Sequence, residues 1–181
     1  MVHYEMRFSG TGGQGMMLMG DVMAQAAGIA GGNEVVLTKS YGPESRGGAC
    51  RSELIVDEQN INYPVVAKPD FVLAMSQLAC DQYITDLKED GVLLLDSGLV
   101  RKQPEQVKNL YAIPLTQLAV ETTGKAITAN VVALGAISVL SPAAQAESIL
   151  DAVLARFPEK LHAINQKAFE AGAAAAKAMV Q

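Results

Sequence analysis

The stretch of this chain with the clearest chemical potential is the glycine-rich segment Gly10-Thr11-Gly12-Gly13-Gln14-Gly15. Because glycine lacks a Cβ atom, a ligand can approach this backbone closely, and glycine also adopts the positive φ values that a sharp turn requires. An alternating pattern (Tyr4, Met6, Phe8) predicts a strand before the segment, and a Met- and Ala-rich pattern predicts a helix from Met16 onward. A helix N-terminus presents unpaired N–H groups and the positive end of its dipole, so the segment favours an anion such as phosphate.

The spacing of Gly10, Gly12 and Gly15 also fits G-x-G-x-x-G, the fingerprint of dinucleotide-binding loops. The same spacing is compatible with a tight turn that brings a helix close to a sheet and holds no ligand. A nicotinamide-binding domain further needs an Asp or Glu at the end of its second strand to hold the ribose hydroxyls. The predicted second strand, residues 34–39, is followed by Ser40 instead, which counts against a dehydrogenase.

In place of that acid stands a second glycine-rich loop, Ser40-Tyr41-Gly42-Pro43-Glu44-Ser45-Arg46-Gly47-Gly48. If the first two strands are parallel neighbours, we expect both loops at the carboxyl edge of the sheet, where open α/β sheets bind ligands. Arg46 would then place a planar guanidinium beside a helix N-terminus, a pair suited to phosphate. The alternative is a surface arginine in a mobile loop.

The rest of the chain alternates strand and helix patterns. Continuous apolar runs predict buried parallel strands at 71–75, 92–95 and 110–113. Residues 52–56 and 61–63 predict a β-hairpin. Later patterns predict helices at 116–123, 128–140, 143–156 and 159–180. The expected fold is α/β: a Rossmann-like, doubly wound, mostly parallel sheet with an inserted β-hairpin and C-terminal helices. With no internal repeat or linker, residues 1–181 are expected to form a single domain.

Two of the helical patterns make specific predictions about burial. In the helix after the first glycine loop, Ile29 is expected to widen the buried apolar stripe. Ser76 is expected to cap the helix that follows residues 71–75, with Leu78, Ile84 and Leu87 pointing inward.

Composition limits the partners that we expect. Charged residues make up 18% of the chain and apolar residues 50%, whereas soluble domains average about 25% charged. A surface so poor in charge predicts coverage by partner chains. The net charge of −5 and the absence of a basic stripe argue against nucleic acid. The longest apolar run, within 131–140, is too short to span a bilayer, and no secretion signal is visible, so no membrane partner is expected.

The four residues that most often bind metals or sulfur clusters are isolated in this sequence. Cys50 and Cys80 stand thirty residues apart, which favours a reducing cytoplasm over a disulfide framework. Two cysteines cannot supply the four thiolates of a four-iron cluster. His3 and His162 also lack neighbouring ligands. We therefore expect no metal site, and structural roles for all four.

Taken together, the two glycine-rich loops strongly resemble those of the gamma subunit of 2-oxoacid:ferredoxin oxidoreductases. The resemblance extends through the strand at 52–56, Tyr63-Pro64, Lys68-Pro69-Asp70, and the helix that carries Asn130, Val131, Ala133, Leu134 and Gly135. It covers most of the chain up to about Leu140.

This resemblance implies a subunit of an enzyme that oxidatively decarboxylates a 2-oxoacid with coenzyme A, giving an acyl-CoA, carbon dioxide and reduced ferredoxin. The implied partners are alpha and beta subunits, together with a ferredoxin-like delta subunit in some complexes, and ferredoxin itself. Thiamine diphosphate and iron–sulfur clusters would belong to those partners, because this chain lacks a Gly-Asp-Gly run, a cysteine cluster and a paired base and nucleophile. No catalytic residue is therefore expected here. The first choice of substrate is 2-oxoglutarate, with pyruvate and branched-chain 2-oxoacids still open.

The resemblance associates the gamma subunit with coenzyme A, whose phosphates need the kind of anion site described above. The candidate binding residues are Gly10, Thr11, Gly12, Gly13, Gln14, Gly15, Ser40, Tyr41, Gly42, Arg46, Gly47, Gly48 and Asn130. The glycine loops would offer backbone N–H donors, Gln14 and Ser40 hydrogen bonds, Arg46 a charge, and Tyr41 a ring for the adenine or the thiol arm. Two alternatives remain: a scaffold subunit whose loops only shape an interface, and a free-standing NAD(P)-dependent oxidoreductase.

Overall fold

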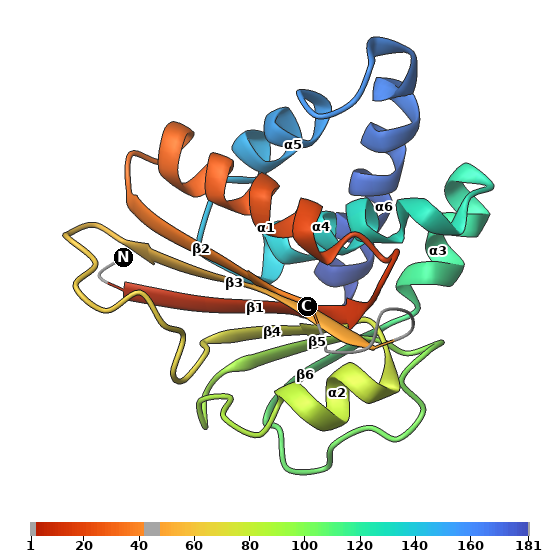
Figure 1. Ribbon diagram of the computed structural model, residues 1–181. Helices are drawn as coiled ribbons and strands as arrows, with labels where there is room; N and C mark the ends of the chain where they lie inside the picture. Colours follow the sequence, from red (N-terminus) through yellow and green to blue (C-terminus); the bar gives the residue numbers. More distant parts are fainter. Residues whose placement is uncertain (1–2, 42–47, 181) are drawn as a thin grey trace.

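The protein is built on one mixed sheet, seen edge-on in the computed structural model (Figure 1), which describes residues 3–41 and 48–180. The strands lie in the order β2-β3-β1-β4-β5-β6. Their bounds are β1 His3–Thr11, β2 Glu34–Ser40, β3 Ala49–Asp57, β4 Phe71–Ala74, β5 Val92–Asp96 and β6 Asn109–Ile113. Strands β1, β4, β5 and β6 are parallel to one another, whereas β3 runs antiparallel to both β1 and β2. The predicted α/β fold with a mostly parallel sheet is confirmed.

The order of the strands corrects one premise of the sequence analysis. Strands β1 and β2 are not neighbours, because β3 lies between them. Both nevertheless run antiparallel to β3, so they point the same way and end at the same edge of the sheet.

The predicted hairpin between residues 52–56 and 61–63 is wrong. Residues 52–56 belong to β3, which forms an antiparallel hairpin with β2 instead, and residues 58–70 contain no strand. The backbone of this segment is held by β1 rather than by a ladder. The Glu5 carboxylate accepts hydrogen bonds from the N–H groups of Ala67 and Lys68 at 3.0 and 2.9 Å.

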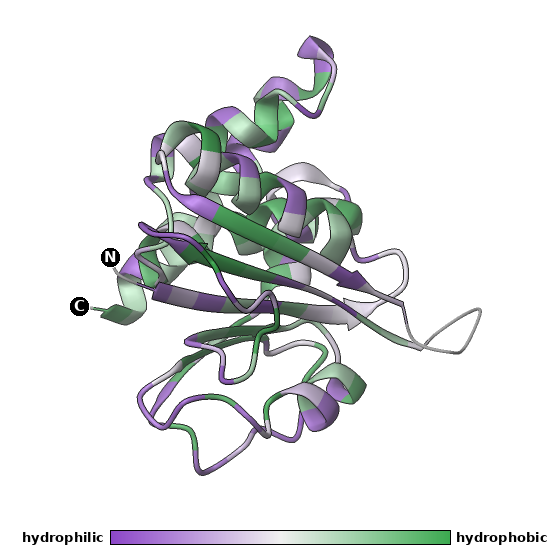
Figure 2. Cartoon of the chain, turned by 60° about the vertical axis from the view of Figure 1, so that its left-hand side comes forward, coloured by the Kyte–Doolittle hydropathy of each residue, from purple (hydrophilic) through white to green (hydrophobic). Residues whose placement is uncertain are grey.

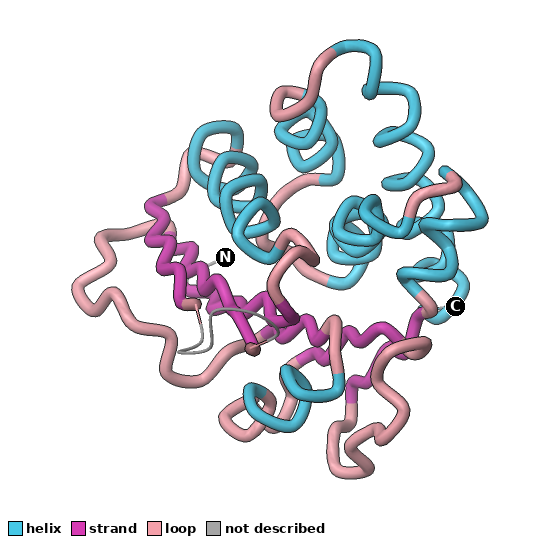
Figure 3. The backbone as a smooth tube through the Cα atoms, turned by 45° about the vertical axis from the view of Figure 1, so that its right-hand side comes forward, coloured by secondary structure: helices cyan, strands magenta, loops and turns pink. Residues whose placement is uncertain are grey.

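Helices cover both faces of the sheet, and most of them lie on one face. Their bounds are α1 Met16–Ala24, η1 Gln25–Ala30, α2 Gln77–Tyr83, α3 Leu115–Thr123, η2 Ala126–Thr128, α4 Ala129–Leu140, α5 Ala146–Leu154, η3 Glu159–Leu161 and α6 His162–Val180. Figure 3 shows the short helix α2 on one side of the sheet and the remaining helices on the other. We call these sides the α2 face and the α4 face. Among the residues that the structure describes, every helix is too short or too polar to cross a lipid bilayer.

Each face of the sheet has its own apolar core. Met6, Phe8 and Leu73 point to the α4 face and belong to the larger core, which includes most of α4. Val72 and Leu93 point to the α2 face and pack with Cys80 of α2 in a smaller core. Strands β4 and β5 are buried on both faces, which explains why their sequences are continuous apolar runs rather than alternating ones.

The burial predictions for the helices are met only in part. Ser76 caps α2 as expected, since its Oγ accepts a hydrogen bond from Ala79 N at 3.2 Å. Ile84 and Leu87 pack against the smaller core. Leu78, however, is 49% exposed, because the buried side of α2 carries Ala79 and Cys80 instead.

Ile29 is also misplaced by the sequence pattern, with 84% of its surface exposed. It lies in η1, a π-helical segment that continues α1. A π-helix forms i→i+5 hydrogen bonds, so a stripe extrapolated at 3.6 residues per turn no longer lands on the buried side.

Strand β1 carries a stripe of polar residues on the α2 face, visible as hydrophilic colour in Figure 2. Its centre is Arg7, whose side chain is 3% exposed. Arg7 Nε donates to Glu53 Oε1 at 2.7 Å, and its terminal nitrogens donate to Asp86 and to the Tyr83 carbonyl. Burial disfavours the charge of Arg7, but the hydrogen bonds to Asp86 and Glu53 outweigh that effect and raise its pKa. The stripe therefore ties α2 and the chain after it to the middle of the sheet.

Candidate functional site

The first glycine loop connects β1 to α1 and is held in place by one of its own side chains. The Gln14 Oε1 atom accepts hydrogen bonds from Thr11 N at 2.7 Å and from Thr11 Oγ1 at 3.0 Å. Gln14 Nε2 donates to the carbonyl oxygen of Met75, at the end of β4, at 2.8 Å. The loop is thereby fixed both within itself and to the neighbouring strand.

The four glycines of this loop divide into two pairs with different surroundings. A Cβ on Gly10 would lie 2.6 Å from Gln14 Oε1, and a Cβ on Gly15 would collide with the Asn130 amide nitrogen. Gly12 and Gly13 are exposed, and a Cβ on either would meet no protein atom within 4 Å. Gly10 and Gly15 are thus required by the protein itself, whereas Gly12 and Gly13 face open space.

Asn130 is brought to this loop from far along the sequence. It lies in the first turn of α4, is only 6% exposed, and its Oδ1 atom accepts a hydrogen bond from Val131 N at 2.8 Å. Its Nδ2 atom lies against Gly15, which has a φ of 81° and forms the N-cap of α1. The structure therefore unites the candidate residue of α4 with the first loop.

The described ends of the second loop lie at the same edge of the sheet as the first loop. The register pairs Thr11 with Ala49, and Ser40 with Arg51, so the start of β3 lies between the ends of β1 and β2. Neighbouring strands are about 4.8 Å apart, so these two ends are separated by about 10 Å. Ser40 and Tyr41 are exposed, and Gly48 is half-buried. The candidates Gly42, Arg46 and Gly47 lie outside the described residues.

The first loop also lies between two strands whose following helices pack on opposite faces of the sheet. Strand β1 continues into α1 on the α4 face, whereas its parallel neighbour β4 continues into α2 on the opposite face (Figure 1). Such a topological switch point opens a crevice at the carboxyl ends of the two strands, and α/β proteins bind ligands there. The Gln14–Met75 hydrogen bond crosses this crevice.

Two pockets adjoin the loop, and both are lined by Gly13 and Ile127. One, of about 240 Å³, lies over the crevice and is also lined by Gln14, Met75 and Leu99. The other, of about 310 Å³, lies between α1, α4 and the start of α6. Its further lining residues include Gly15, Leu18, Lys125, Asn130 and Phe157. Each pocket combines apolar walls with polar groups of the loop.

Lys125 and Arg51 are charged residues near the site that the sequence analysis passed over. Lys125 follows the αL residue Gly124 that ends α3, lines the 310 Å³ pocket, and forms no ion pair with any residue in the described part of the chain. Its place directly after a helix-ending glycine is the one sequence signal that could have singled it out.

Arg51 stands in β3 opposite both Ser9 and Ser40, close to the edge of the sheet where β1 and β2 end. Its guanidinium lies 5.0 Å from the centre of the Tyr83 ring. Its Nε atom is 3.4 Å from Glu53 Oε2, near enough for electrostatic attraction, but the geometry gives it no hydrogen bond. Nothing in the sequence distinguishes this arginine from an ordinary strand residue.

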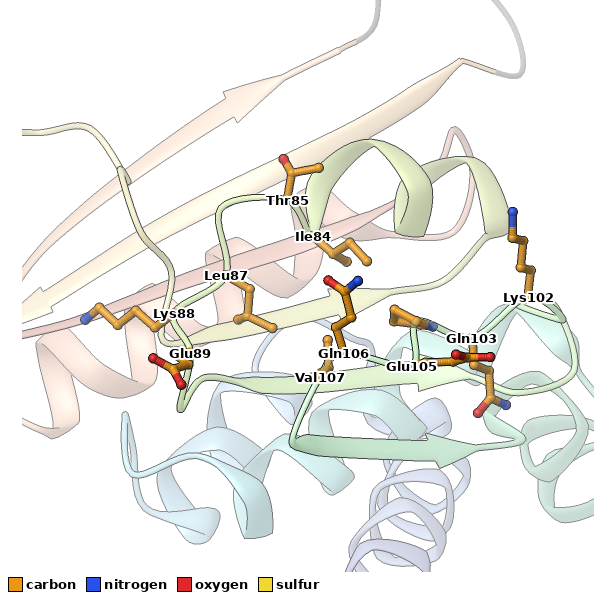
Figure 4. A pocket seen from close by; sticks show the side chains of 11 residues that line it. Ile84, Thr85, Leu87, Lys88, Glu89, Lys102, Gln103, Glu105, Gln106 and Val107 are labelled. Atoms are coloured by element: carbon orange, nitrogen blue, oxygen red, sulfur yellow. The ribbon is translucent and has the colours of Figure 1, made fainter.

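A larger pocket than these two lies away from the first loop. It has a volume of about 690 Å³ and is on the α2 face, between the chain after α2 and residues 102–107. Figure 4 shows Ile84 and Gln106 pointing toward each other across it, with Lys102 at one end and Lys88 at the other. None of the candidate binding residues that the structure describes lines it, so size alone does not identify the functional site.

Burial disfavours the reactive thiolate form of both cysteines. Cys50 and Cys80 are free and buried. Burial raises the pKa of both, that of Cys80 to about 11, so both are protonated at neutral pH. Neither can act as a nucleophilic thiolate.

The family model for pyruvate ferredoxin/flavodoxin oxidoreductases matches residues 5–175 of this chain. The chain belongs to this family. A 2-oxoglutarate synthase subunit, KorC, from Methanocaldococcus jannaschii is 42% identical over 175 residues, which cover 96% of this chain and 94% of the relative.

Two solved structures carry the comparison further. The gamma subunit of a keto/oxoacid ferredoxin oxidoreductase from Geobacter sulfurreducens matches with a TM-score of 0.91 and 44% identity, covering 98% of both chains. A 2-oxoglutarate:ferredoxin oxidoreductase from Magnetococcus marinus, solved with 2-oxoglutarate, coenzyme A and succinyl-CoA bound, matches with a TM-score of 0.87 and 26% identity. The match covers 98% of this chain and 32% of that one. The resemblance to gamma subunits of 2-oxoacid:ferredoxin oxidoreductases is confirmed.

Proposed function

We propose that this chain is the gamma subunit of a 2-oxoglutarate:ferredoxin oxidoreductase and that it binds coenzyme A where β1 and β2 end. The reaction converts 2-oxoglutarate, coenzyme A and oxidised ferredoxin into succinyl-CoA, carbon dioxide and reduced ferredoxin. The choice of 2-oxoacid is supported by the KorC relative, and the ligand by the coenzyme A bound in the Magnetococcus marinus enzyme. The observation that carries the proposal is the open space around Gly12 and Gly13, beside the N-terminus of α1.

The residues divide the work according to their surroundings. The backbone N–H groups of Gly12 and Gly13 and the positive end of the α1 dipole suit a phosphate of coenzyme A. Arg46 adds a charge from the second loop. Ser40 and Tyr41 are exposed at the same edge, so they are free to contact the nucleotide or its thiol arm. Such a ligand is long enough to reach across the roughly 10 Å between the two strand ends.

Lys125 and Asn130 extend this set toward the 310 Å³ pocket that they line. Lys125 is a cation without an ion pair among the described residues, so a phosphate would not have to displace an existing partner. The Asn130 amide nitrogen lies beside Gly15, the N-cap of α1. Lys125 is therefore added to the candidates that the sequence supplied.

The decarboxylation and electron transfer are assigned to partner subunits. Alpha and beta subunits, with a ferredoxin-like delta subunit where one is present, would hold thiamine diphosphate and the iron–sulfur clusters and would pass electrons to ferredoxin. This division is supported by the protonated, separate thiols of Cys50 and Cys80. The same free thiols support a cytoplasmic location. Within the complex, residues 1–181 would act as one domain.

Gly12→Ala is the experiment that tests the proposal most directly. An added Cβ at Gly12 meets no protein atom within 4 Å and this glycine has no positive φ, so folding should be unaffected. A methyl group that blocks the approach of a phosphate should raise the coenzyme A KM of the assembled enzyme about tenfold, equivalent to about 1.4 kcal/mol. The KM for the 2-oxoacid should stay the same.

Gly98→Ala provides the matched control, since Gly98 is exposed after β5 and its Cβ would meet only Asp96 Oδ1, at 3.3 Å. An unchanged coenzyme A KM in Gly12→Ala, with loss of complex assembly instead, would favour the scaffold alternative. Thermal-shift titrations of the assembled complex with coenzyme A, desulfo-CoA and NAD(H) distinguish the coenzyme A-binding subunit and the scaffold subunit from a nicotinamide-dependent enzyme. Only the last of these would be stabilised by NAD(H). That last alternative is further weakened by Ser40, which ends β2 where an acid would be required.

A further inference from the structure

We infer that Gln14 is a positioning residue, which holds the first glycine loop in its open shape and does not itself contact coenzyme A. The inference rests on the proposed function, because it concerns the same loop. It also revises the role that the sequence suggested for Gln14, that of a hydrogen-bonding contact to the ligand.

The Gln14 amide is almost fully used by the protein. Its oxygen can accept two hydrogen bonds, and both come from Thr11, through the backbone N–H and the hydroxyl group. Its nitrogen can donate two, and one goes to the Met75 carbonyl. A phosphate oxygen accepts hydrogen bonds, so the oxygen of Gln14 offers it nothing, and only the second N–H of Nε2 could reach it. The other three hydrogen-bonding positions of the amide all serve the loop and β4.

The partner groups of Gln14 are themselves fixed by the sheet. Met75 is 1% exposed, and its N–H donates to the Ser9 carbonyl of β1 at 2.9 Å. Gly10 is buried and leaves room for Gln14 Oε1, since a Cβ there would lie 2.6 Å from that atom. Gln14 therefore bridges the crevice between β1 and β4 with a rigid group at each end.

A glycine-rich loop needs such a bridge, because glycine loses more conformational freedom on ordering than any other residue. Gly12 and Gly13 are exposed and have no side chain to pack, and a Cβ on either would find no protein atom within 4 Å. A loop that is already ordered before the ligand arrives avoids that entropic cost at the moment of binding. The ligand-free geometry of the loop is thus set by Gln14.

The experiment compares Gln14→Ala and Gln14→Glu with Gln77→Ala in the assembled enzyme. Gln77 is a matched control, because its amide also bridges two segments: Oε1 accepts from Lys102 N at 2.9 Å and Nε2 donates to Lys102 O at 3.1 Å. Gln14→Ala should raise the coenzyme A KM about tenfold with little change in kcat or in the 2-oxoacid KM. Gln14→Glu should raise the coenzyme A KM at least as far as Gln14→Ala. It keeps an acceptor for Thr11, but it loses the donor to Met75 and adds a negative charge beside the proposed phosphate site. Gln77→Ala should leave the coenzyme A KM unchanged.

Hydrogen exchange of the loop in the ligand-free complex separates positioning from direct contact. Gln14→Ala should speed amide exchange in the peptide that contains Gly12 and Gly13 before any coenzyme A is added. A raised coenzyme A KM with unchanged exchange would mean that Gln14 contacts the ligand directly. An unchanged KM with unchanged exchange would mean that Gln14 neither orders the loop nor contacts the ligand. Either result overturns the inference. If Gly12→Ala has no effect on the coenzyme A KM, the proposed function fails, while the exchange rates still report on the loop.

Discussion

Gly135 of α4 and Gly172 of α6 each make room for the backbone of the other helix. A Cβ on Gly135 would collide with the Phe169 carbonyl, and a Cβ on Gly172 with the Val132 carbonyl. Both glycines are buried in the described structure, and both helices contribute to the larger core. The close crossing of α4 and α6 therefore depends on the absence of side chains at two reciprocal positions.

Gly135→Ala and Gly172→Ala should each lower the free energy of unfolding by about 1–3 kcal/mol, because the helices must move apart and core packing is lost. Urea denaturation monitored by circular dichroism measures the effect. Gly12→Ala is the control, as its Cβ meets no protein atom within 4 Å. Equal midpoints for all three variants would show that the crossing tolerates a methyl group.

Gly15→Ala should destabilise the fold through two separable effects. The φ of 81° is strained for any residue with a Cβ, at a cost of about 1–3 kcal/mol, and the new methyl group would also collide with Asn130. Adding Asn130→Ala removes the collision but leaves the strain, so the double variant should be more stable than the sum of the single effects predicts. A double-mutant cycle in urea measures this coupling, and strictly additive effects would rule out the contact.

Arg46→Ala should weaken coenzyme A binding if Arg46 holds a phosphate. A charge-assisted hydrogen bond is worth about 1.5–3 kcal/mol, which corresponds to a roughly 10- to 150-fold rise in the coenzyme A KM. The 2-oxoacid KM should hardly move. Arg46→Lys should rescue only part of the loss, because a point charge does not reproduce the two-pronged guanidinium. Steady-state kinetics of the complex test this expectation. Full activity of Arg46→Ala with an unchanged coenzyme A KM would show that Arg46 does not bind coenzyme A.

The stability of the fold should depend on pH through His3. The hydrogen bond to Asp57 raises the pKa of His3 above its ordinary 6.5, assisted by Glu5 and opposed by burial. A raised folded-state pKa means that this stabilisation is complete below pH 6.5 and is lost as pH rises through the folded pKa. His3→Gln should flatten that part of the stability profile. An NMR titration of the His3 ring that gave a pKa below 6.5 would contradict this expectation.

The strands that are buried on both faces of the sheet could be predicted from the sequence. The runs at β4 and β5 are apolar throughout because both faces of those strands are buried. The short pattern at 61–63 misled, because alternation over three residues does not specify a partner, and β3 instead pairs with β2 over seven register positions. The predicted fold class was nevertheless correct, because the predicted hairpin and the observed β2–β3 hairpin each place one antiparallel pair of strands beside a parallel sheet.

The candidate site was predictable as a set of segments but not as a set of contacts. The glycine loop could be recognised by its composition. One hydrogen-bond partner of Gln14, however, is Met75, which lies 61 residues away in the sequence. The same holds for Gly15 and Asn130, whose contact appears only when α4 folds against α1. Local patterns report what a segment prefers, whereas long-range hydrogen bonds decide which of its groups remain free for a ligand.

The order of the strands has a consequence for how this chain is made. Strand β1 precedes the other strands in the sequence and lies in the middle of the sheet, so later strands must add to it on both sides. Helix α1 can cover part of the α4 face early, but α4 comes only after all six strands, and the glycine surface of α4 stays uncovered until α6 follows. Apolar surface exposed in this way on a nascent chain invites aggregation. The fold is therefore secured late in synthesis, when α6 closes over α4.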